Sequence, residues 1–285
     1  MSINEKNKVE SSTLYLVGTP IGNLADITER AKKILSEVDF IAAEDTRNSM
    51  KLLSCFGIHA ELVSYYEHNK RESGDRIIAR LISGESCALI TDAGMPAISD
   101  PGEDLVRLCA DAGVTVRVVP GPSACVSALA LSGLSTARFT FEGFLPAQKG
   151  DRRKRLDALK NEDRTMIFYE APHKLRATLD DMLDTFGPSR KISLCRELTK
   201  LNEEAHRTTI SDAVNYYKEK EPRGEYVLVV EGGVPGEDKD NPLLLLSPED
   251  HVKHYESSGM KRMDAIKAAA KDRGMTKSEL YKLLV

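Results

Sequence analysis

The chain has 285 residues, of which 41% are hydrophobic and 29% charged, and its formal net charge is −4. This composition is ordinary for a soluble globular protein and excludes an intrinsically disordered chain. No stretch approaches the ~18 consecutive apolar residues of a transmembrane helix, and the polar N-terminus MSINEKNKVESS lacks the apolar core of a secretory signal.

Residues 13–123 alternate short apolar runs with amphipathic segments, which is typical of an α/β domain. Strands are predicted at 14–18, 39–45, 61–66, 87–93 and 114–120, and helices at 27–38, 46–57, 73–84 and 101–113. This alternation predicts a mostly parallel sheet that helices cover on both faces.

A small-residue-rich stretch, 120–133, predicts a buried helix that is entered through a tight loop. The apolar runs after it predict strands at 138–144, 165–171, 191–198 and 225–233, with helices at 151–161, 172–186 and 210–220. Long connections between these strands indicate a second α/β domain with a mixed sheet, at 124–235.

The C-terminal part is different in composition. Residues 234–242 have the Gly, Pro and acidic composition of a linker, and three short helices are predicted at 247–259, 260–274 and 275–284. The last two have the layout of a helix-turn-helix, with Gly274 in the turn and Thr276 as N-cap. A helical hairpin that packs on the core is the alternative. The predicted division is thus a flexible N-terminus at 1–12, domains at 13–123 and 124–235, and a linker with a basic tail at 236–285.

Basic residues gather in two places. Residues 251–285 hold eight Lys/Arg and four Asp/Glu, and the run KGDRRKR at 149–155 holds five basic residues and one acid. Two basic patches on an otherwise acidic chain suggest contact with a polyanion, with solvated helix faces as the alternative.

The cysteine and histidine positions speak against metal and disulfide chemistry. The five cysteines form no CxxC pair, which predicts reduced thiols in a cytoplasmic protein. The six histidines are scattered without an HExxH motif, so no metal site is expected. Nucleotide-binding GxGxxG and GK[ST] motifs and the GxSxG elbow are absent as well.

Three Gly/Pro-rich loops follow predicted strands: LVGTPIGN (16–23), TDAGMPAISDPG (91–102) and VVPGPSA (118–124). Loops at the carboxyl ends of parallel strands converge on one crevice, where ligands bind in open α/β sheets. Glycines let the backbone approach a ligand closely, so its N–H and C=O groups can recognise a neutral or zwitterionic ligand.

Eight motifs resemble, in order, those of the tetrapyrrole-methylase superfamily of S-adenosylmethionine-dependent methyltransferases. They are VGTPIGNLADIT (17–28), AEDTR (43–47), TDAGMPAISDPG, PGPSA (120–124), GFLP (143–146), FYEAPHK (168–174), RELTK (196–200) and RGEYVLVVEG (223–232). The resemblance covers about residues 13–235. It implies two α/β domains of this type, the cofactor cleft between them, a small helical tail and a homodimer.

Within the superfamily, the motif set is most similar to the branch that methylates the ribose 2′-oxygen of a decoding-centre cytidine (cytidine 1402) of 16S rRNA. The resemblance therefore implies S-adenosylmethionine as cofactor and 16S rRNA in the small ribosomal subunit as partner.

The resemblance carries the cofactor site onto sixteen residues of this chain: Thr19, Pro20, Gly22, Asp92, Ala93, Gly94, Met95, Ile98, Ser123 and Ala124 from the first domain, and Tyr169, Glu170, Pro172, Gly224, Glu225 and Tyr226 from the second. Other branches have Gly-Asp-Pro where this chain has Gly94-Met95-Pro96, with Asp92 just before it. Which carboxylate meets the polar end of the cofactor is left open by this departure.

A ribose hydroxyl is a weak nucleophile, so a general base would help methyl transfer. The candidates are Glu44, Asp45, Arg47, Asp92, Glu197 and Lys200, of which we predict Asp45 and Glu197 as catalytic. The alternative for each is a structural ion pair at a strand end.

RNA contact is predicted for ten basic residues: Arg47, Lys149, Arg152, Arg153, Arg155, Lys200, Lys261, Arg262, Lys271 and Arg273. Two other functions stay open at this point. One is C-methylation of a tetrapyrrole of the precorrin or uroporphyrin type, or methylation of a protein side chain. The other is a non-catalytic RNA-binding module.

Overall fold

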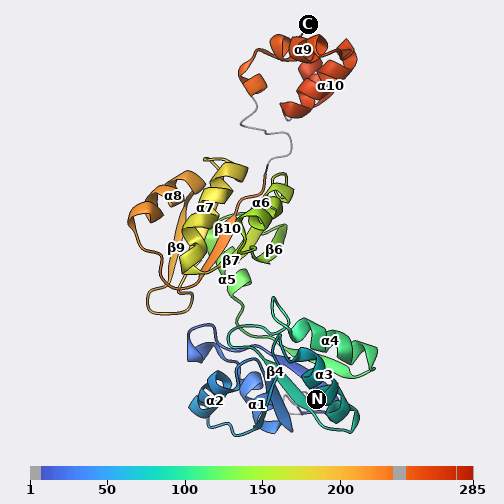
Figure 1. Cartoon of the computed structure of the whole chain (residues 1–285), viewed down its shortest axis with the longest axis vertical. Coiled ribbons are helices and arrows are strands. Elements are labelled where there is room, and N and C mark those ends of the chain that lie inside the picture. The colour runs from blue at the N-terminus through green and yellow to red at the C-terminus, as the bar shows by residue number, and fades with distance from the viewer. Residues whose placement is uncertain (1–7, 234–241, 274, 285) are drawn as a thin grey trace. The chain divides into compact units, whose positions relative to one another are not determined.

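The computed structural model describes residues 8–233, 242–273 and 275–284 (Figure 1). The chain forms two compact units. Unit 1 comprises Met1–Ser127 and Glu197–Glu203, and unit 2 comprises Ala128–Arg196 and Glu204–Val285. The predicted division places 197–203 in the second domain, whereas this loop clusters with unit 1.

Unit 1 is built on a five-stranded parallel sheet of order β3-β2-β4-β1-β5. Its strands are β1 (Thr13–Val17), β2 (Phe40–Ala43), β3 (Glu61–Ser64), β4 (Cys87–Ile90) and β5 (Thr115–Val119). Its helices are α1 (Glu29–Glu37), α2 (Thr46–Cys55), α3 (Lys70–Ile82), α4 (Gly102–Asp111) and the start of α5 (Ala124–Ser132), with a 3-10 turn at Leu24–Asp26. The predicted α/β fold with a parallel sheet is confirmed.

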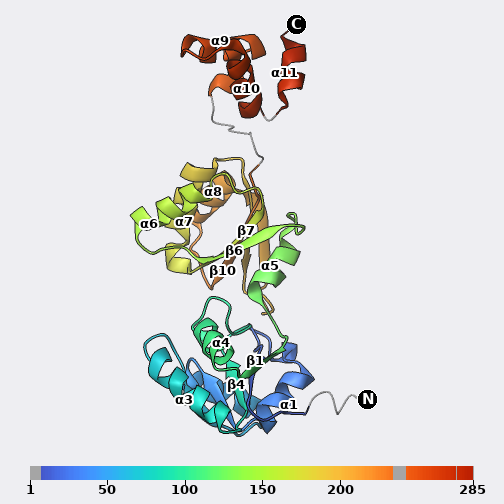
Figure 2. The same ribbon diagram turned by 90° about the vertical axis from the view of Figure 1, so that its right-hand side faces the viewer.

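Side-chain alternation along the central strands produces two hydrophobic clusters, one on each face of the sheet. Tyr15 and Ile41 join α1 and α2 in one cluster, whereas Leu14 and Phe40 join α3 and α4 in the other. Figure 2 shows α3 and α4 on one side of β1 and β4 and α1 on the other. Burial on both faces explains why these strands are apolar runs rather than alternating ones.

The first residues differ from the prediction of a flexible N-terminus at 1–12. Residues 1–7 lie outside the described residues, but Glu10 accepts a hydrogen bond from Arg117 at 2.6 Å and its backbone N–H donates to Tyr15 at 2.9 Å. Val9 packs against the core. These contacts fix residues 8–12 to unit 1, so the prediction is wrong for them.

Unit 2 has a mixed sheet of order β6-β7-β10-β8-β9, in which only β6 and β7 pair in parallel. The strands are β6 (Phe139–Phe144), β7 (Thr165–Glu170), β8 (Lys191–Arg196), β9 (Glu204–Thr209) and β10 (Tyr226–Val230). Helices α6 (Lys149–Ala158), α7 (Pro172–Phe186) and α8 (Ile210–Glu219) share one core cluster with residues of β7, β8 and β10. The sequence did not predict β9, since EAHRTT has no apolar alternation.

Helix α5 lies where a buried helix is predicted, but it is only half buried. Cys125, Ala128 and Leu129 face the core, whereas Val126 is 54% exposed. A helix that is apolar all round gives no sequence signal for which side meets solvent, and this explains the error.

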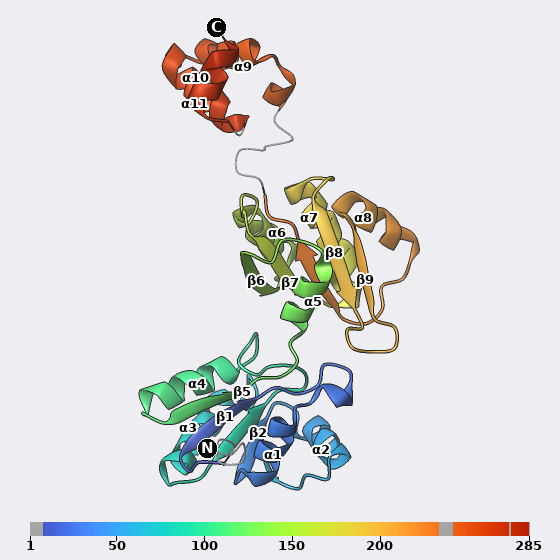
Figure 3. The ribbon, with the colours of Figure 1, turned by 180° about the vertical axis from the view of Figure 1, so that it is seen from behind.

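The tail of unit 2 contains a 3-10 turn (Pro242–Leu245) and helices α9 (Pro248–Ser257), α10 (Arg262–Asp272) and α11 (Lys277–Leu283), as Figure 3 shows. Its own hydrophobic cluster consists of Val252, Ala265, Ile266, Ala269, Ala270 and Leu280. The predicted N-caps are confirmed, since Ser247 accepts from Asp250 and Thr276 forms a capping box with Glu279. The predicted linker, apart from Pro242, lies outside the described residues.

No helix among the described residues is long and apolar enough to cross a membrane. The same residues hold no cluster of three or more His, Cys, Asp or Glu that could bind a metal ion. The five cysteines all lie among the described residues, where none of them forms a disulfide and four are buried.

One buried ion pair joins α6 to α7. Asp181, with a 3% exposed side chain, accepts hydrogen bonds from Arg152 Nε at 2.8 Å and Arg153 Nε at 2.7 Å. Burial opposes ionisation, but the hydrogen bonds from Arg153 and Arg152 hold the pKa of Asp181 below its ordinary value. Asp184 pairs with Arg153 as well, but it is 63% exposed.

We expect Asp181→Asn to lower the free energy of unfolding by about 3 kcal/mol, because Arg152 would be left as a buried charge without a counter-charge. Asp184→Asn is the matched control and should cost less than about 0.5 kcal/mol, as exposed pairs do. Urea denaturation followed by circular dichroism measures both. Equal losses in the two variants would contradict this account.

Candidate functional site

Four loops of unit 1 leave the carboxyl edge of its parallel sheet. They follow β1 (18–23), β2 (44–45), β4 (91–101) and β5 (120–123). Because β2, β4, β1 and β5 are neighbours in this order, all four loops lie along one edge, where α/β proteins bind ligands.

The β1 and β4 loops are joined through Thr19 and Gly94. Each backbone N–H donates to the carbonyl of the other residue, at 2.9 and 3.1 Å. The Thr19 hydroxyl, which is fully buried, donates to the carbonyl of Thr91 at 3.1 Å. Thr19 therefore fixes the two loops together through its side chain.

The β1 and β5 loops meet backbone to backbone. A Cβ atom added to Gly18 would lie 2.7 Å from Gly121 Cα and 2.7 Å from Met95 Sδ, closer than any real contact. Gly94 has φ +88°, a left-handed conformation that favours glycine. The three Gly/Pro loops predicted to converge do so, and their glycines are required by close approach.

Asp100 holds the β4 loop in shape. Its carboxylate accepts three backbone N–H groups, those of Ala97 at 3.0 Å, Ile98 at 3.2 Å and Gly102 at 2.7 Å. Ala97 and Ser99 both have φ near +65°, which is uncommon outside glycine. Between them Ile98 is 48% exposed, so the loop presents an apolar side chain to solvent. The sequence motif alone did not predict this role of Asp100.

Glu44, directly after β2, is an exposed carboxylate at this edge. It accepts a hydrogen bond from the Thr91 hydroxyl at 3.2 Å. Desolvation by the loops, together with the charges of Asp92, Asp100 and Asp45, raises the pKa of Glu44 above its ordinary value. Glu44 was among the sequence candidates but was not the one predicted as catalytic.

Asp45 has a different role. It is the N-cap of α2, accepting from the backbone N–H groups of Arg47 at 2.9 Å and Asn48 at 3.4 Å, and it pairs with the Arg47 guanidinium at 3.2 Å. Hydrogen bonds from Arg47 hold the pKa of Asp45 below its ordinary value. A capped, charge-paired carboxylate is a poor proton acceptor, so the structure supports the alternative of a structural ion pair for Asp45 and Arg47.

The loop Glu197–Glu203 brings two further predicted residues to the β1 loop. Glu197 and Lys200 form an ion pair at 3.0 Å, and a Cβ added to Gly22 would lie 2.6 Å from Lys200 Cγ. Glu197 and Thr199 have φ +52° and +66°. Such strained residues persist only where the surroundings fix them, and they cluster at functional sites.

Several other predicted cofactor residues lie on these loops. Asp92 is exposed and accepts from Asn48 Nδ2 at 3.2 Å. Ser123 precedes α5, and its hydroxyl lies 3.3 Å from Cys125 Sγ. The others are Pro20, Ala93, Met95 and Ala124, and all belong to unit 1.

In unit 2, the side chains of two predicted cofactor residues are buried and form hydrogen bonds within the fold. Glu170 is 3% exposed and accepts hydrogen bonds from the Thr178 hydroxyl at 2.5 Å and the Ala171 N–H at 2.9 Å, so it holds the start of α7. Tyr226 is 2% exposed, and its hydroxyl accepts from the Arg223 N–H at 3.2 Å. Burial of both side chains corrects the prediction that they contact the cofactor.

The other four predicted cofactor residues of unit 2 are Tyr169, Pro172, Gly224 and Glu225. The ring of Tyr169 packs edge-on against Phe141 and Phe144, with centroids 5.0 and 5.4 Å apart. Pro172 is the first residue of α7, Gly224 has φ +73°, and Glu225 is exposed. Their assignment to the cofactor stays a prediction.

The basic run of α6 is mostly neutralised. Arg152 and Arg153 pair with Asp181, and Arg155 pairs with Glu142. Arg152 is only 6% exposed, so it is withdrawn from the predicted RNA contacts. Lys149 is exposed.

In the tail, Arg273 Nε donates to His251 Nδ1 at 3.1 Å and its Nη2 donates to the Leu246 carbonyl. Arg273 thus holds the tail together, which corrects its prediction as an RNA contact. Arg262 lies 3.5 Å from Glu256, and Lys261 is exposed. The side chain of Lys271 lies outside the described part of the chain.

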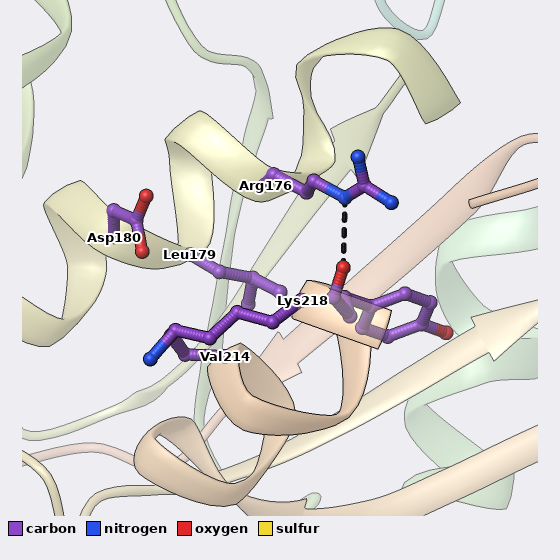
Figure 4. Close-up of a pocket in the computed structure, with 6 residues that line it drawn as sticks. Arg176, Leu179, Asp180, Val214 and Lys218 are labelled. Carbon is purple, nitrogen blue, oxygen red and sulfur yellow. Dashed lines mark hydrogen bonds between the residues drawn. The ribbon is translucent and has the colours of Figure 1, made fainter. Parts of the chain in front are cut away.

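A small hollow between α7 and α8 is no rival site (Figure 4). Arg176 donates to the Tyr217 carbonyl across it at 2.7 Å, and Leu179 and Val214 form its wall. Its volume of about 90 Å³ is well below the ~300–1,000 Å³ of ligand pockets.

Comparison with known proteins gives a family match over most of the chain. The family model of the Tetrapyrrole (Corrin/Porphyrin) Methylases matches residues 13–214. A relative from Halalkalibacterium halodurans is 50% identical over 275 residues, with 96% of this chain and 95% of the relative covered. One from Bacillus subtilis is 47% identical over 99% of this chain and 96% of the relative. Both are named ribosomal RNA small subunit methyltransferase I.

Solved structures show the same fold at low identity. Uroporphyrin-III-C-methyltransferase from Thermus thermophilus has a TM-score of 0.55 and 21% identity, covering 77% of this chain and 94% of that one. A cobalt precorrin-4 methyltransferase has a TM-score of 0.56 and 17% identity, covering 77% and 95%. The agreement supports the two α/β units.

We expect Gly18→Ala to lower the free energy of unfolding by about 1–3 kcal/mol, because the new methyl group would force the β1 and β5 loops apart. It should also weaken binding of S-adenosylmethionine, the cofactor predicted from the sequence, as measured by calorimetry. Gly150→Ala is the control, since nothing lies within 4 Å of a Cβ there and the helix should gain slightly. Unchanged binding in Gly18→Ala would show that the loop contact does not shape the site.

Proposed function

The chain belongs to the tetrapyrrole methylase family, and from this membership and the loops of unit 1 we propose that it transfers a methyl group from S-adenosylmethionine to 16S rRNA of the small ribosomal subunit. The observation that carries the proposal is sequence identity. Two relatives, whose names specify ribosomal RNA of the small subunit, are 50% and 47% identical to this chain over nearly its full length. The finer proposal is the acceptor: the ribose 2′-oxygen of cytidine 1402 in the decoding centre. Its support is the motif resemblance.

The loops of unit 1 fit the proposed cofactor. S-adenosylmethionine has no phosphate and needs no P-loop, and backbone groups with a few carboxylates suit its zwitterionic end. The crevice edge is formed by glycine backbones packed so closely that a Cβ would not fit, with acidic side chains beside them. Gly94, Ile98, Ser123 and Asp92 would hold the cofactor. When bound, its sulfonium supplies an activated methyl group.

Methyl transfer is an in-line displacement, so alignment supplies a large share of catalysis, ~7–11 kcal/mol in well-oriented systems. The chain provides this alignment through rigid loops: Thr19 bonds to Gly94, and Asp100 fixes the turn that presents Ile98. Both sets of hydrogen bonds involve backbone atoms, so the loops have little freedom to move.

The proton of the ribose hydroxyl needs an acceptor, and we propose Glu44 in place of Asp45. A base works best when its pKa lies near the working pH, and the environment of Glu44 raises its pKa, whereas Arg47 lowers that of Asp45. Glu197, paired with Lys200 over Gly22, stays the second proposed catalytic residue, and Lys200 would meet the RNA backbone.

The homodimer and the cytoplasmic location implied by the sequence remain proposals. The half-exposed apolar face of α5, with Val126 at 54%, is the feature of unit 1 that suits a second copy of the chain.

Glu44→Gln is expected to lower kcat by about 10²–10⁴-fold, the usual contribution of a general base. The folded-state pKa of Glu44 is raised, so the native state holds its proton more tightly and stability falls as pH rises through the window from the unfolded to the folded pKa. The variant should therefore be as stable as the wild type or slightly more so at pH 7. A pH–rate profile whose acid limb disappears in the variant would identify the base.

Glu37→Gln is the matched control for Glu44, because Glu37 is exposed at the end of α1, which leads into β2 at the edge of the sheet opposite these loops. It should leave the pH profile unchanged. A Glu44→Gln enzyme within severalfold of wild-type turnover would exclude Glu44 as base.

The function itself is tested by incubating the protein with labelled S-adenosylmethionine and small subunits from cells that lack it, followed by mass mapping. We expect one new 2′-O-methyl group on a decoding-centre cytidine. Cofactor binding without transfer to rRNA, but with transfer to a tetrapyrrole precursor, would overturn the substrate assignment. Failure to bind the cofactor would overturn the proposed chemistry.

A further inference from the structure

Three exposed lysines of the tail have no acidic partner among the described residues: Lys261 before α10, Lys267 on α10 and Lys277 on α11. Lys267 lies on the side of α10 away from its buried Ala265 and Ala269. Ion pairs of these three lysines therefore do not contribute to the stability of the described part of the tail.

Three acids of the tail have partners other than these lysines, whereas Asp264, three residues from both Lys261 and Lys267, is exposed. Asp250 pairs with Lys253 at 3.4 Å, and Asp272 accepts from the hydroxyl of Tyr255 and lies 3.2 Å from His251 Nε2. The Glu279 carboxylate accepts the Thr276 N–H at 2.7 Å in the capping box. The acids thus stabilise the tail and leave its lysines exposed.

The second basic cluster of the chain, on α6, shows the opposite arrangement. Arg153 bonds to Asp181 and Asp184, and Arg155 bonds to Glu142, whose side chain is 4% exposed. Lys154 lies 3.7 Å from Asp151. Although both clusters have the same net charge in the sequence, the α6 cluster is paired except for the exposed Lys149, whereas the tail presents three such lysines.

An aromatic ring accompanies the unpaired lysines. Tyr281 follows Lys277 by four residues, so both lie on one face of α11, and Tyr281 is 49% exposed. The hydrophobic cluster of the tail takes Leu280 instead. The capping box at Thr276 fixes where α11 begins and therefore which residues share this face.

We propose that Lys261, Lys267, Lys277 and Tyr281, the basic surface of α10 and α11, dock the RNA substrate: the lysines contact phosphates, and Tyr281 stacks on an unpaired base. This inference rests on the proposed rRNA methyltransferase function. Lysine ammonium groups attract the RNA backbone, and base stacking on an exposed ring is a common means of holding single-stranded segments. Residues 251–285 carry a net charge of +4 while the other 250 residues carry −8, so the tail is the part of the chain whose net charge attracts RNA.

The test uses the full chain and small ribosomal subunits, with binding measured by filter retention across a salt series. Lys267→Ala/Lys277→Ala should weaken binding about tenfold at low salt and lower the slope of log K against log salt by about 2. Tyr281→Ala should weaken binding at least about fivefold with the slope unchanged, and Tyr281→Phe should restore it. The matched control, Lys253→Ala/Lys282→Ala, removes the same charge from the same tail off this face. It should bind as the wild type does.

Methyl transfer is measured on the same variants. The tail variants should raise KM for subunits and leave kcat unchanged, because the substituted residues belong to the tail and not to the loops of unit 1. Variants that bind and methylate as the wild type does would overturn the tail inference while the proposed function stands. A wild type that binds subunits through this surface but transfers no methyl group would overturn the function and leave the docking surface. If the control variant loses as much affinity for subunits as Lys267→Ala/Lys277→Ala, or if the protein binds duplex DNA as tightly as subunits, net charge alone explains the binding. Either result would also overturn the proposal.

Discussion

The contact between the glycine backbones of the β1 and β5 loops is the constraint on which the site of unit 1 depends. Gly18 and Gly121 lie so close that neither position admits a Cβ, and Met95 of the β4 loop closes on the same point. Close-packed interiors do not deform continuously, so a contact of this kind sets the position of all three loops at once. The hydrogen bonds between Thr19 and Gly94 then fix the β1 and β4 loops in register.

The carboxylates around these loops differ in how far hydrogen bonds within the fold stabilise their charge. The carboxylates of Asp45 and Asp100 accept hydrogen bonds from backbone N–H groups. Asp45 does so as the N-cap of α2, and Asp100 does so in the turn around Ile98. Glu44 has one hydroxyl donor and acidic neighbours, so its proton is held more tightly than in water. Glu44 and Asp45, which are neighbours in the chain, thus acquire opposite pKa shifts, because hydrogen bonding stabilises the charged form and desolvation destabilises it.

The same distinction separates the two basic runs. Arginines on α6 bind carboxylates that lie within the fold of unit 2, since the planar guanidinium suits paired, partly buried geometry. The tail presents lysines in solvent, where a flexible ammonium group can follow a phosphate backbone. Composition alone counts both runs as equal.

The sequence by itself determined the elements of the fold and the convergence of three loops. In unit 1, apolar runs that alternate with helices predict a parallel sheet, and parallel strands end at one edge, so the motifs TPIG, AGMPAISDPG and PGPSA were expected to meet. The tertiary structure alone decided which charged residues are free to act. Asp45, Glu170, Arg152 and Arg273 look reactive in a sequence, but each meets a partner that the chain order does not reveal. The strand β9 was not predicted because it carries no apolar alternation, although it pairs with the neighbouring β8. The placement of Glu197–Glu203 in unit 1 was not predicted because it depends on contacts far apart in the chain, such as that of Lys200 with Gly22.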